Sequence, residues 1–548
     1  MKIFKQYHTV LYLLSVLCLT SLNNFLNAQT IDEGIKLIDL ERYNDAKAAF
    51  ESVIKNNPKN APEAYYYLGE LSIADSQFTQ ALDYFNKGLE IDKENPYSQV
   101  GLGHLKLIDN DTLAAQKYFE EALDITDDED VNIFIQIADA YIKSGITDLS
   151  RPIDWLNKAK KIKNQKNNPL IYYKLAQIYL KLNNGTSARE NFQNAINYDK
   201  NFIRGYLGIA DIYIRIKNYT DAENYLHEAL QIDSNYTATY LALSDFYGTV
   251  KNYVKSAVAY KSYIDLSGKT DEKLIKYSTL LYLARDYEDA VKVINEVGKE
   301  KSNDPQLEHI LAYSYYSLQD TTQGIAAFDQ YLSMVKPQDY LSTDFLYYGQ
   351  LLAMDGKDSL AIVNFNKALS MDTTLTDLYG EIANLYFKDK KYDEAADELI
   401  LKEQKTGKKL SLREYLNLGL SYMATRHFHK ADSAFAMLTE LKPDLPLGYL
   451  MQAAANASID TTSEQGLAKP YYEKFIQTAT SSPDSLKYKK DLIEAYSYLG
   501  YFYYIKRKDP EYKDTWRQNY IDNWTKVLAL DPTNEKAKNA MDNLKLIK

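Results

Sequence analysis

A large apolar residue followed by a small one, first clear at Leu68-Gly69, recurs about every 34 residues along almost the whole chain. An aromatic residue and alanines then follow at helical spacing, as in Phe78, Ala81 and Phe85 after the first pair. Other clear copies begin at Leu102-Gly103, Leu175-Ala176, Ile209-Ala210, Leu418-Gly419 and Leu499-Gly500. Steps of three and four residues place such positions on one stripe of a helix, and turn residues midway split each repeat in two. Each repeat is therefore predicted to form an antiparallel helix pair.

Small residues where two helices cross closely, with large residues between them, resemble the pattern of the tetratricopeptide repeat (TPR) family. The tryptophan often found near the start of that motif is missing here. We count about fourteen repeats, which begin near Ala28, Pro62, Pro96, Val131, Pro169, Ile203, Thr237, Asp271, Pro305, Ser342, Thr376, Leu412, Pro446 and Ile493. The resemblance implies an all-α fold, a right-handed superhelical solenoid of TPR helix pairs.

One helix pair cannot bury its apolar face alone, so neighbouring repeats must stack into a continuous core. We therefore expect one solenoid over residues 29–532, although 548 residues would usually suggest several globular domains. In residues 533–548, Ala537, Met541 and Leu544 share one face of a predicted helix. We interpret this segment as a C-terminal capping helix that covers the last open edge of the core.

The first 28 residues are of a different kind. Lys2 and Lys5 precede an apolar run at residues 10–19, and the small residue Ala28 follows a polar stretch. This order of a basic region, an apolar region and a small residue predicts a signal peptide over residues 1–28. An uncleaved membrane anchor is the alternative, but the apolar run is shorter than the roughly 20 residues that a membrane-spanning helix needs.

Cys18 is the only cysteine of the chain and opens a further alternative, lipoprotein processing at the end of the apolar run. Leu17 stands where that signal resembles a small residue, and apolar residues continue beyond the cysteine, which argues against acylation. After cleavage behind Ala28 the mature chain would hold no cysteine, and it would fold without disulfides.

The charge balance of the chain is acidic. The net charge is −11, and removal of Lys2 and Lys5 with the signal peptide takes it to −13. Basic runs are short, which argues against nucleic acid, and the acidic balance favours a basic protein segment as partner. No second hydrophobic segment reaches spanning length, so we expect a mature protein that is soluble or peripherally associated with a membrane, without a transmembrane helix.

Motifs for catalysis are lacking. Gly268-Lys269-Thr270 ends like a phosphate-binding loop, but Tyr263 stands in place of the required earlier glycine. His427 and His429 have no carboxylate or cysteine at ligand spacing, which fits two solvated turn histidines better than a metal site. Neither a Gly-x-Ser-x-Gly elbow nor a His-Glu-x-x-His helix occurs. We therefore expect no enzyme activity, no catalytic residue, no metal and no cofactor.

In the TPR family the first helix of each pair lines the concave side, and its second, fifth, ninth and twelfth positions face a groove. The resemblance thus implies that the partner-binding candidates are Glu63, Tyr66, Glu70, Tyr97, His104, Asp139, Tyr173, Gln177, Arg204, Asp211, Asp245, His309, Tyr313, Tyr316, Tyr501 and Tyr504. Tyrosines would supply flat contact area, and the acids would favour a basic segment. The alternative for each residue is a solvated inner wall.

Some relatives hold the terminal carboxylate of a peptide with a lysine and asparagine pattern. At the matching places this chain has Tyr66 and Glu70, or Leu207 and Asp211. We therefore do not expect capture of a chaperone C-terminus by that mechanism.

An Asp-(Ser/Thr)-(Leu/Ala/Thr) triplet begins at Asp111, Asp320, Asp358, Asp372, Asp432, Asp460 and Asp484. It resembles the O-glycosylation signal of exported proteins in Bacteroidetes-type bacteria, and the alternative is helix capping by Asp, Ser and Thr. Together with the signal peptide, the triplets indicate an exported TPR protein of such a bacterium, in the periplasm or associated with the outer membrane.

These observations favour a non-catalytic scaffold or adaptor of the bacterial cell envelope that binds protein partners in its concave groove. An alternative comes from the 50 tyrosines, against 18 phenylalanines and 3 tryptophans. Because sugars stack on aromatic faces, this composition also suggests a carbohydrate-binding or glycan-uptake accessory protein, although such sites usually carry tryptophan.

Overall fold

The computed structural model describes residues 30–297 and 304–544, and every regular element in these ranges is a helix. The predicted signal peptide and Cys18 lie outside the described residues. The helices belong to two compact units, which divide at Ile310 inside helix α18 (Pro305–Ser317).

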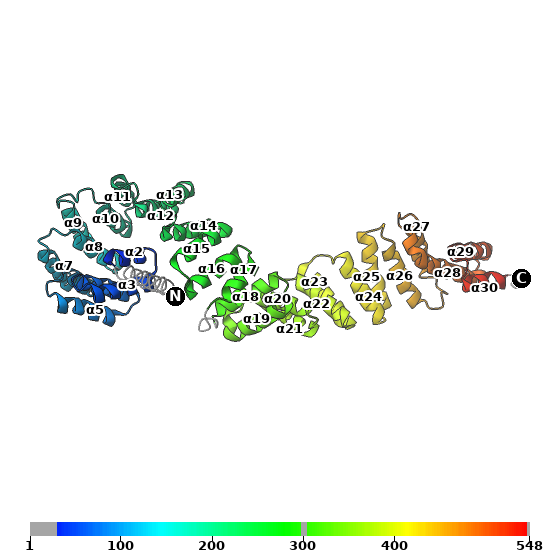
Figure 1. Ribbon diagram of the computed structural model, residues 1–548. Coiled ribbons are helices and arrows are strands. Elements are labelled where there is room, and N and C mark those ends of the chain that lie inside the picture. Colours follow the sequence, from blue (N-terminus) through cyan, green and yellow to red (C-terminus); the bar gives the residue numbers. More distant parts are fainter. Residues whose placement is uncertain (1–29, 298–303, 545–548) are drawn as a thin grey trace, which may run out of the picture. The chain divides into compact units, whose positions relative to one another are not determined.

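The first unit holds eight helix pairs before α18 (Figure 1). In chain order they are α2 (Ile31–Asp39) with α3 (Tyr43–Asn56), α4 (Ala61–Ala74) with α5 (Phe78–Ile91), α6 (Pro96–Ile108) with α7 (Thr112–Ile125), α8 (Val131–Lys143) with α9 (Ser150–Ala159), α10 (Pro169–Lys181) with α11 (Gly185–Tyr198), α12 (Ile203–Arg215) with α13 (Tyr219–Ile232), α14 (Thr237–Thr249) with α15 (Tyr253–Ser267), and α16 (Asp271–Leu283) with α17 (Tyr287–Ile294).

Six more pairs follow, and the last is succeeded by the single helix α30 (Glu535–Leu544). They are α18 with α19 (Thr321–Met334), α20 (Ser342–Met354) with α21 (Asp358–Met371), α22 (Asp377–Lys388) with α23 (Tyr392–Thr406), α24 (Leu412–Ala424) with α25 (Phe428–Leu441), α26 (Pro446–Ile459) with α27 (Lys469–Thr480), and α28 (Lys489–Ile505) with α29 (Trp516–Leu530). Short 3-10 turns occur at Pro337–Asp339, Ser485–Tyr488 and Lys506–Lys508. The described residues thus form fourteen pairs, which confirms the predicted all-α repeat architecture, and each first helix begins within four residues of its predicted start.

Capping side chains and left-handed residues set the helix ends. Asn184 and Asn218 cap the second helices of two successive repeats, each accepting a hydrogen bond from a backbone N–H three residues on. The residue before each cap, Asn183 or Lys217, has a positive φ and closes the preceding helix. Asp111 caps α7 in the same way, so the capping alternative accounts structurally for that Asp-Thr-Leu triplet, as it does for the one at Asp320.

The recurring small residue exists because a ring of the second helix packs directly against the backbone of the first. The Phe85 ring is fully buried, and a Cβ atom added at Gly69 would lie 2.2 Å from its Cε1 atom. The same ring meets the next repeat, where a Cβ atom on Gly101 would lie 2.3 Å from it. One aromatic ring thus joins two repeats into a continuous core.

First helices of neighbouring repeats pack against one another, as in α4 with α6, α6 with α8 and α8 with α10. The second helices are held mainly by their own first helix and by the first helix of the next repeat. The first helices therefore form the inner side of the first unit, where Figure 1 shows α8, α10 and α12 inside α7, α9, α11 and α13.

Helix α30 packs on α29 through the buried side chains of Ala537 and Leu544, which contact Tyr520 and Trp524. The Tyr520 hydroxyl donates a hydrogen bond to the Ala540 carbonyl at 2.7 Å. In the part of the chain that the structure describes, no helix combines the length and the apolar character that crossing a membrane requires.

Candidate interaction surface

The candidate surface is the inner wall, which we define as the groove-facing side of the first helices within each unit. Two of its predicted contact residues are not accessible. Tyr66 and His104 are each 1% exposed, and the Tyr66 hydroxyl donates a hydrogen bond to Gln136 Oε1 at 3.0 Å. The prediction that these two side chains offer contact area to a partner is therefore wrong, because neighbouring first helices approach closely enough to cover them.

A ladder of charged groups crosses four first helices of the first unit. His104 Nδ1 lies 2.8 Å from Glu70 Oε1, and Lys143 Nζ lies 3.4 Å from the other oxygen of Glu70. Lys143 also contacts Asp139 at 2.8 Å, and Lys174 Nζ reaches Asp139 at 2.5 Å. Burial opposes ionisation of Asp139, but the charges of Lys174 and Lys143 outweigh it and hold the pKa of that carboxyl well below its ordinary value.

The ladder and two further ion pairs compensate the negative charge of most predicted acidic contact residues. Asp211 and Asp245, further along the same wall, are paired with Arg215 at 2.8 Å and with Lys276 at 3.0 Å. These carboxylates, like Glu70 and Asp139, are already neutralised within the chain. Because of this pairing, four of the acids expected to favour a basic partner carry no surplus charge. Sequence offsets alone do not reveal it.

Glu63 is the exception among the predicted acids. It is half-buried at the start of α4, and no cation pairs with it among the described residues. Burial and the nearby charges of Asp130 and Asp32 raise its pKa to about 7, although a hydrogen bond from Tyr97 acts in the opposite direction. The wall is therefore most receptive to positive charge where α2, α4, α6 and α8 begin.

The end of α2, the turn that follows it and the first residue of α3, together residues 38–43, lie against the inner wall of their own unit. We call these residues the corner segment. Asp39 forms an ion pair with Arg204 on α12, and the hydroxyl of Tyr263 on α15 donates a hydrogen bond to Glu41. Arg204 also donates to the Tyr236 hydroxyl at 3.2 Å and lies over the Tyr173 ring, 5.9 Å from its centroid. The predicted positions Tyr173, Gln177 and Arg204 are thus brought together, and the corner segment faces them.

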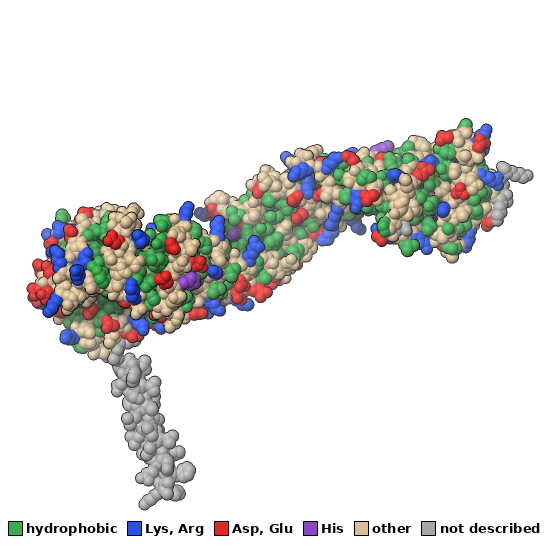
Figure 2. Space-filling view, turned by 90° about the horizontal axis from the view of Figure 1, so that it is seen from above, with side chains coloured by type: hydrophobic (Ala, Val, Ile, Leu, Met, Phe, Trp, Pro, Cys, Tyr) green, Lys and Arg blue, Asp and Glu red, His purple; other side chains and the backbone are tan. Residues whose placement is uncertain are grey.

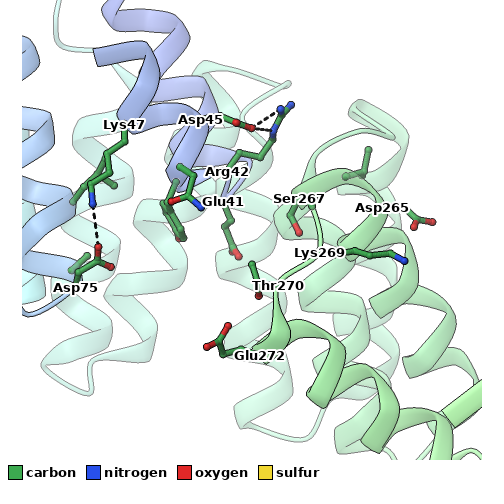
Figure 3. Close-up of a pocket in the computed structure, with 16 residues that line it drawn as sticks. Glu41, Arg42, Asp45, Lys47, Asp75, Asp265, Ser267, Lys269, Thr270 and Glu272 are labelled. Carbon is green, nitrogen blue, oxygen red and sulfur yellow. Dashed lines mark hydrogen bonds and ion pairs between the residues drawn. The ribbon is translucent and has the colours of Figure 1, made fainter. Parts of the chain in front are cut away.

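Two cavities flank the corner segment. One, of about 350 Å³, is lined both by the corner segment and by wall residues that include Tyr173, Gln177, Arg204 and Tyr236. The other, of about 980 Å³, lies between α3, the end of α4 and the turn from α15 to α16. Figure 3 shows the second cavity, with the Lys47–Asp75 and Arg42–Asp45 pairs on one side and Ser267, Thr270 and Glu272 on the other.

In the second unit the inner wall carries a polar and aromatic row. The rings of Tyr316 and Tyr347 stack at a centroid distance of 4.2 Å, and the Tyr316 hydroxyl donates to Gln350 Oε1 at 2.6 Å. Asn417 donates to Asn384 at 2.9 Å across the next two repeats. Tyr316, Tyr347, Gln350 and Asn417 are half-buried and Asn384 is exposed, so this row is accessible.

The remaining predicted residues have different surroundings. Tyr313 is buried, and its hydroxyl contacts Thr343 and Asp344 at 2.8 Å, so it supports the wall instead of facing a partner. His309 is half-buried on α18. On α28, Tyr501 is 48% exposed, whereas Tyr504 is half-buried beneath the Arg507 guanidinium, 4.3 Å from the ring centroid.

Several wall residues were missed in the sequence analysis because the groove offsets were not applied to the tenth to thirteenth repeats. The same offsets lead to Gln350 and Asn384 and to a half-buried apolar stretch on α24 and α26, made of Leu416, Leu420, Met423, Leu447 and Ala454. The signal was therefore present in the sequence. The wall of the second unit changes along its length from polar and aromatic to apolar.

Aromatic platforms of the kind that sugars need are less accessible than the composition suggested. Trp155 and Trp524 are buried, and Trp516 is half-buried. On the face in Figure 2, acidic, basic and hydrophobic side chains are interspersed. Within residues 30–297 and 304–544, no three or more His, Cys, Asp or Glu side chains come together in a way that could hold a metal ion.

Paired helices stacked in this way define a helical repeat protein, and comparisons with known proteins agree. A tetratricopeptide repeat model matches residues 31–96 and 173–237. The crystal structure of the C-terminal part of a TPR repeat-containing protein from Cytophaga hutchinsonii is 35% identical, with 48% of this chain and 98% of that chain covered and a TM-score of 0.38. On this sequence identity and the family model, the chain belongs to the tetratricopeptide repeat family.

Other solved structures are more distant. A TPR protein from Parabacteroides merdae is 14% identical, with 50% of this chain and 93% of that chain covered and a TM-score of 0.26. YrrB, described as a TPR protein with an unusual peptide-binding site, is 16% identical, with 34% and 94% covered and a TM-score of 0.30. No protein of curated function matches the chain. TPR proteins are in general non-catalytic scaffolds for protein interactions.

Proposed function

We propose that this protein is a scaffold or adaptor of the bacterial cell envelope, which holds segments of partner proteins on the inner walls of its two units. The observation that carries the proposal is the row of Tyr316, Tyr347, Gln350 and Asn384 on successive first helices. Tyr316, Tyr347 and Gln350 are half-buried and Asn384 is exposed, so all four retain accessible surface. Aromatic and amide groups of this kind provide contact area and adaptable hydrogen bonds to a peptide.

The envelope location is supported by the signal-peptide pattern and by the Asp-Ser/Thr triplets, and the net charge of −11 suits a basic partner segment. Within the first unit, a lysine or arginine of such a segment would bind near Glu63, where Asp32 and Asp130 add negative charge. The paired acids of the ladder would contribute little, since their charges are already compensated.

Affinity purification from the native envelope, with and without substitutions in the inner wall, tests the proposal. The chain would be compared with a Tyr316→Ala and Asn384→Ala variant, which removes two accessible wall side chains. The matched control is Val258→Ala, because Val258 lies on the second helix α15 and is 64% exposed. We expect a protein partner to be recovered with the natural chain and the control and to be lost from the wall variant. Equal recovery with all three, or no reproducible partner, would contradict the proposal.

A further inference from the structure

The corner segment occupies wall positions that an external partner would use in the first unit. Its contacts join residues far apart in sequence, since Asp39 and Arg204 are separated by 165 positions and Glu41 and Tyr263 by 222. Helix α2 buries only Ile31, Gly34 and Leu37. Figure 1 accordingly shows α2 inside the arc formed by α8, α10 and α12.

The contact between the corner segment and the wall is polar and loosely packed. The side chains of Asp39 and Arg204 keep 32% and 29% exposure, and an ion pair that remains in contact with water is weak. A cavity of about 350 Å³ is lined by Ile38 and Tyr43 on one side and by wall residues on the other, so these two side chains do not fill the space. Such a contact can open without loss of the repeat core, in which Ala46, Ala49 and Phe50 of α3 are buried.

The groups that meet at this contact also show which ligand chemistry the wall accepts. The corner segment brings two carboxylates, one to the guanidinium of Arg204 and one to the hydroxyl of Tyr263. Tyr236 accepts a hydrogen bond from Nε and the Tyr173 ring lies beneath the guanidinium, while Nη2 contacts Asp39 of the corner segment. A planar guanidinium fixed in this way is suited to a carboxylate ligand.

We propose that the corner segment is a reversible intramolecular occupant of the inner wall, and that the part of a partner segment that displaces it is acidic and places a carboxylate on Arg204, at a different place from the basic side chains expected near Glu63. The statement about the partner rests on the proposed scaffold function, whereas the intramolecular occupancy does not. Because the corner segment is tethered, it competes at the high effective concentration of an intramolecular ligand. It would therefore exclude weak acidic peptides and admit those that bind the wall more tightly.

Cysteine labelling of the full chain tests the occupancy. In a Cys18→Ser background, Gln177→Cys places a single thiol on the wall beside the corner segment. We expect a maleimide to label it at least threefold faster when Asp39→Ala and Glu41→Ala are added. Glu33→Ala, which removes an exposed carboxylate from the same helix, should leave the rate unchanged. Unchanged labelling in the double variant would overturn the proposal.

A second reporter separates opening from unfolding. Ala222→Cys on α13 is fully buried and should remain unlabelled in every variant. If Ala222→Cys is labelled in the Asp39→Ala and Glu41→Ala variant, the double substitution has loosened the repeats. The experiment would then be repeated with Arg204→Lys in place of the double substitution. That variant keeps the positive charge but removes the planar guanidinium that Asp39, Tyr236 and the Tyr173 ring contact. Faster labelling of Gln177→Cys in the Arg204→Lys variant, with Ala222→Cys still unlabelled, supports the proposal. An unchanged labelling rate of Gln177→Cys overturns it.

The partner chemistry is tested with a synthetic peptide of residues 34–46 of this chain. Added to the opened variant, it should slow labelling of Gln177→Cys at least twofold, and a peptide with Asp39→Asn and Glu41→Gln should not. Equal protection by both peptides, or none by either, would refute the requirement for carboxylates. Because these measurements need no natural partner, they stand or fall separately from the affinity purification.

Discussion

Substitution of Gly69 by alanine tests the close helix crossing on which the whole repeat depends. The new Cβ atom would lie 2.2 Å from Cε1 of Phe85, and the ring cannot retreat because Gly101 of the next repeat touches it from another side. Overpacking of this kind costs about 1–3 kcal/mol. Alanine recovers about 1 kcal/mol through its better helix propensity. Since the ring is held from both sides, we expect a net loss of about 1–2 kcal/mol.

Hydrogen exchange is the appropriate assay, because stacked repeats need not unfold as one cooperative unit. The loss should accelerate exchange in α4 to α6 by about 5- to 30-fold. Gly185→Ala is the matched control, since nothing lies within 4 Å of a Cβ atom at that helix start. If the amides of α4 exchanged as slowly in Gly69→Ala as in the natural chain, the packing argument would be refuted.

Three further predictions concern buried polar groups. Glu63→Gln should raise the free energy of unfolding above pH 7 by about 1 kcal/mol, after allowance for solvent screening. Because the pKa of this carboxyl is raised to about 7 in the folded state, the natural chain loses stability as the pH rises from the ordinary pKa of a glutamate to about 7, and the variant should show a flatter pH dependence. Hydrogen exchange in α4 of both chains, compared at pH 5 and again at pH 8, would measure the difference. Lys174→Ala should cost about 2–4 kcal/mol, because Asp139 loses a partner at 2.5 Å, and Asp139→Asn added to it should recover part of the loss, as hydrogen exchange in α8 and α10 would show. Tyr313→Phe should cost about 1–3 kcal/mol by removing a hydroxyl 2.8 Å from the buried Asp344 carboxylate; unchanged exchange in α18 and α20 would contradict this.

The repeat architecture could be predicted closely because its determinants are local. A proline in the first turn of α6 and α10, and an asparagine before each helix, are visible in the sequence and mark helix starts. The Leu68-Gly69 pair predicts a close crossing because only a small residue allows a ring to reach the backbone. Such signals return every 34 residues, so the helix boundaries of a repeat with a weak motif can be predicted from those of its neighbours.

The candidate surface could be predicted less well, for two physical reasons. Whether Glu70 or Asp139 is free depends on long lysine side chains from the next repeats, whose directions the sequence does not specify. The approach of Asp39 to Arg204 depends on small rotations that add up over several repeats, so no pattern of period 34 contains it. The second, fifth, ninth and twelfth positions of each repeat did identify residues of the inner wall, but they did not show which of these side chains are buried by neighbouring helices.

Site-specific photocrosslinking in the native envelope tests the central claim, that the inner wall is the partner surface. A crosslinking amino acid would replace Asn384, which is exposed on the first helix α22, and in a second variant Val363, which is 63% exposed on the second helix α21. Our account predicts a discrete crosslinked protein from Asn384 and none from Val363. Crosslinks to the same protein from both positions, or from Val363 alone, would contradict it.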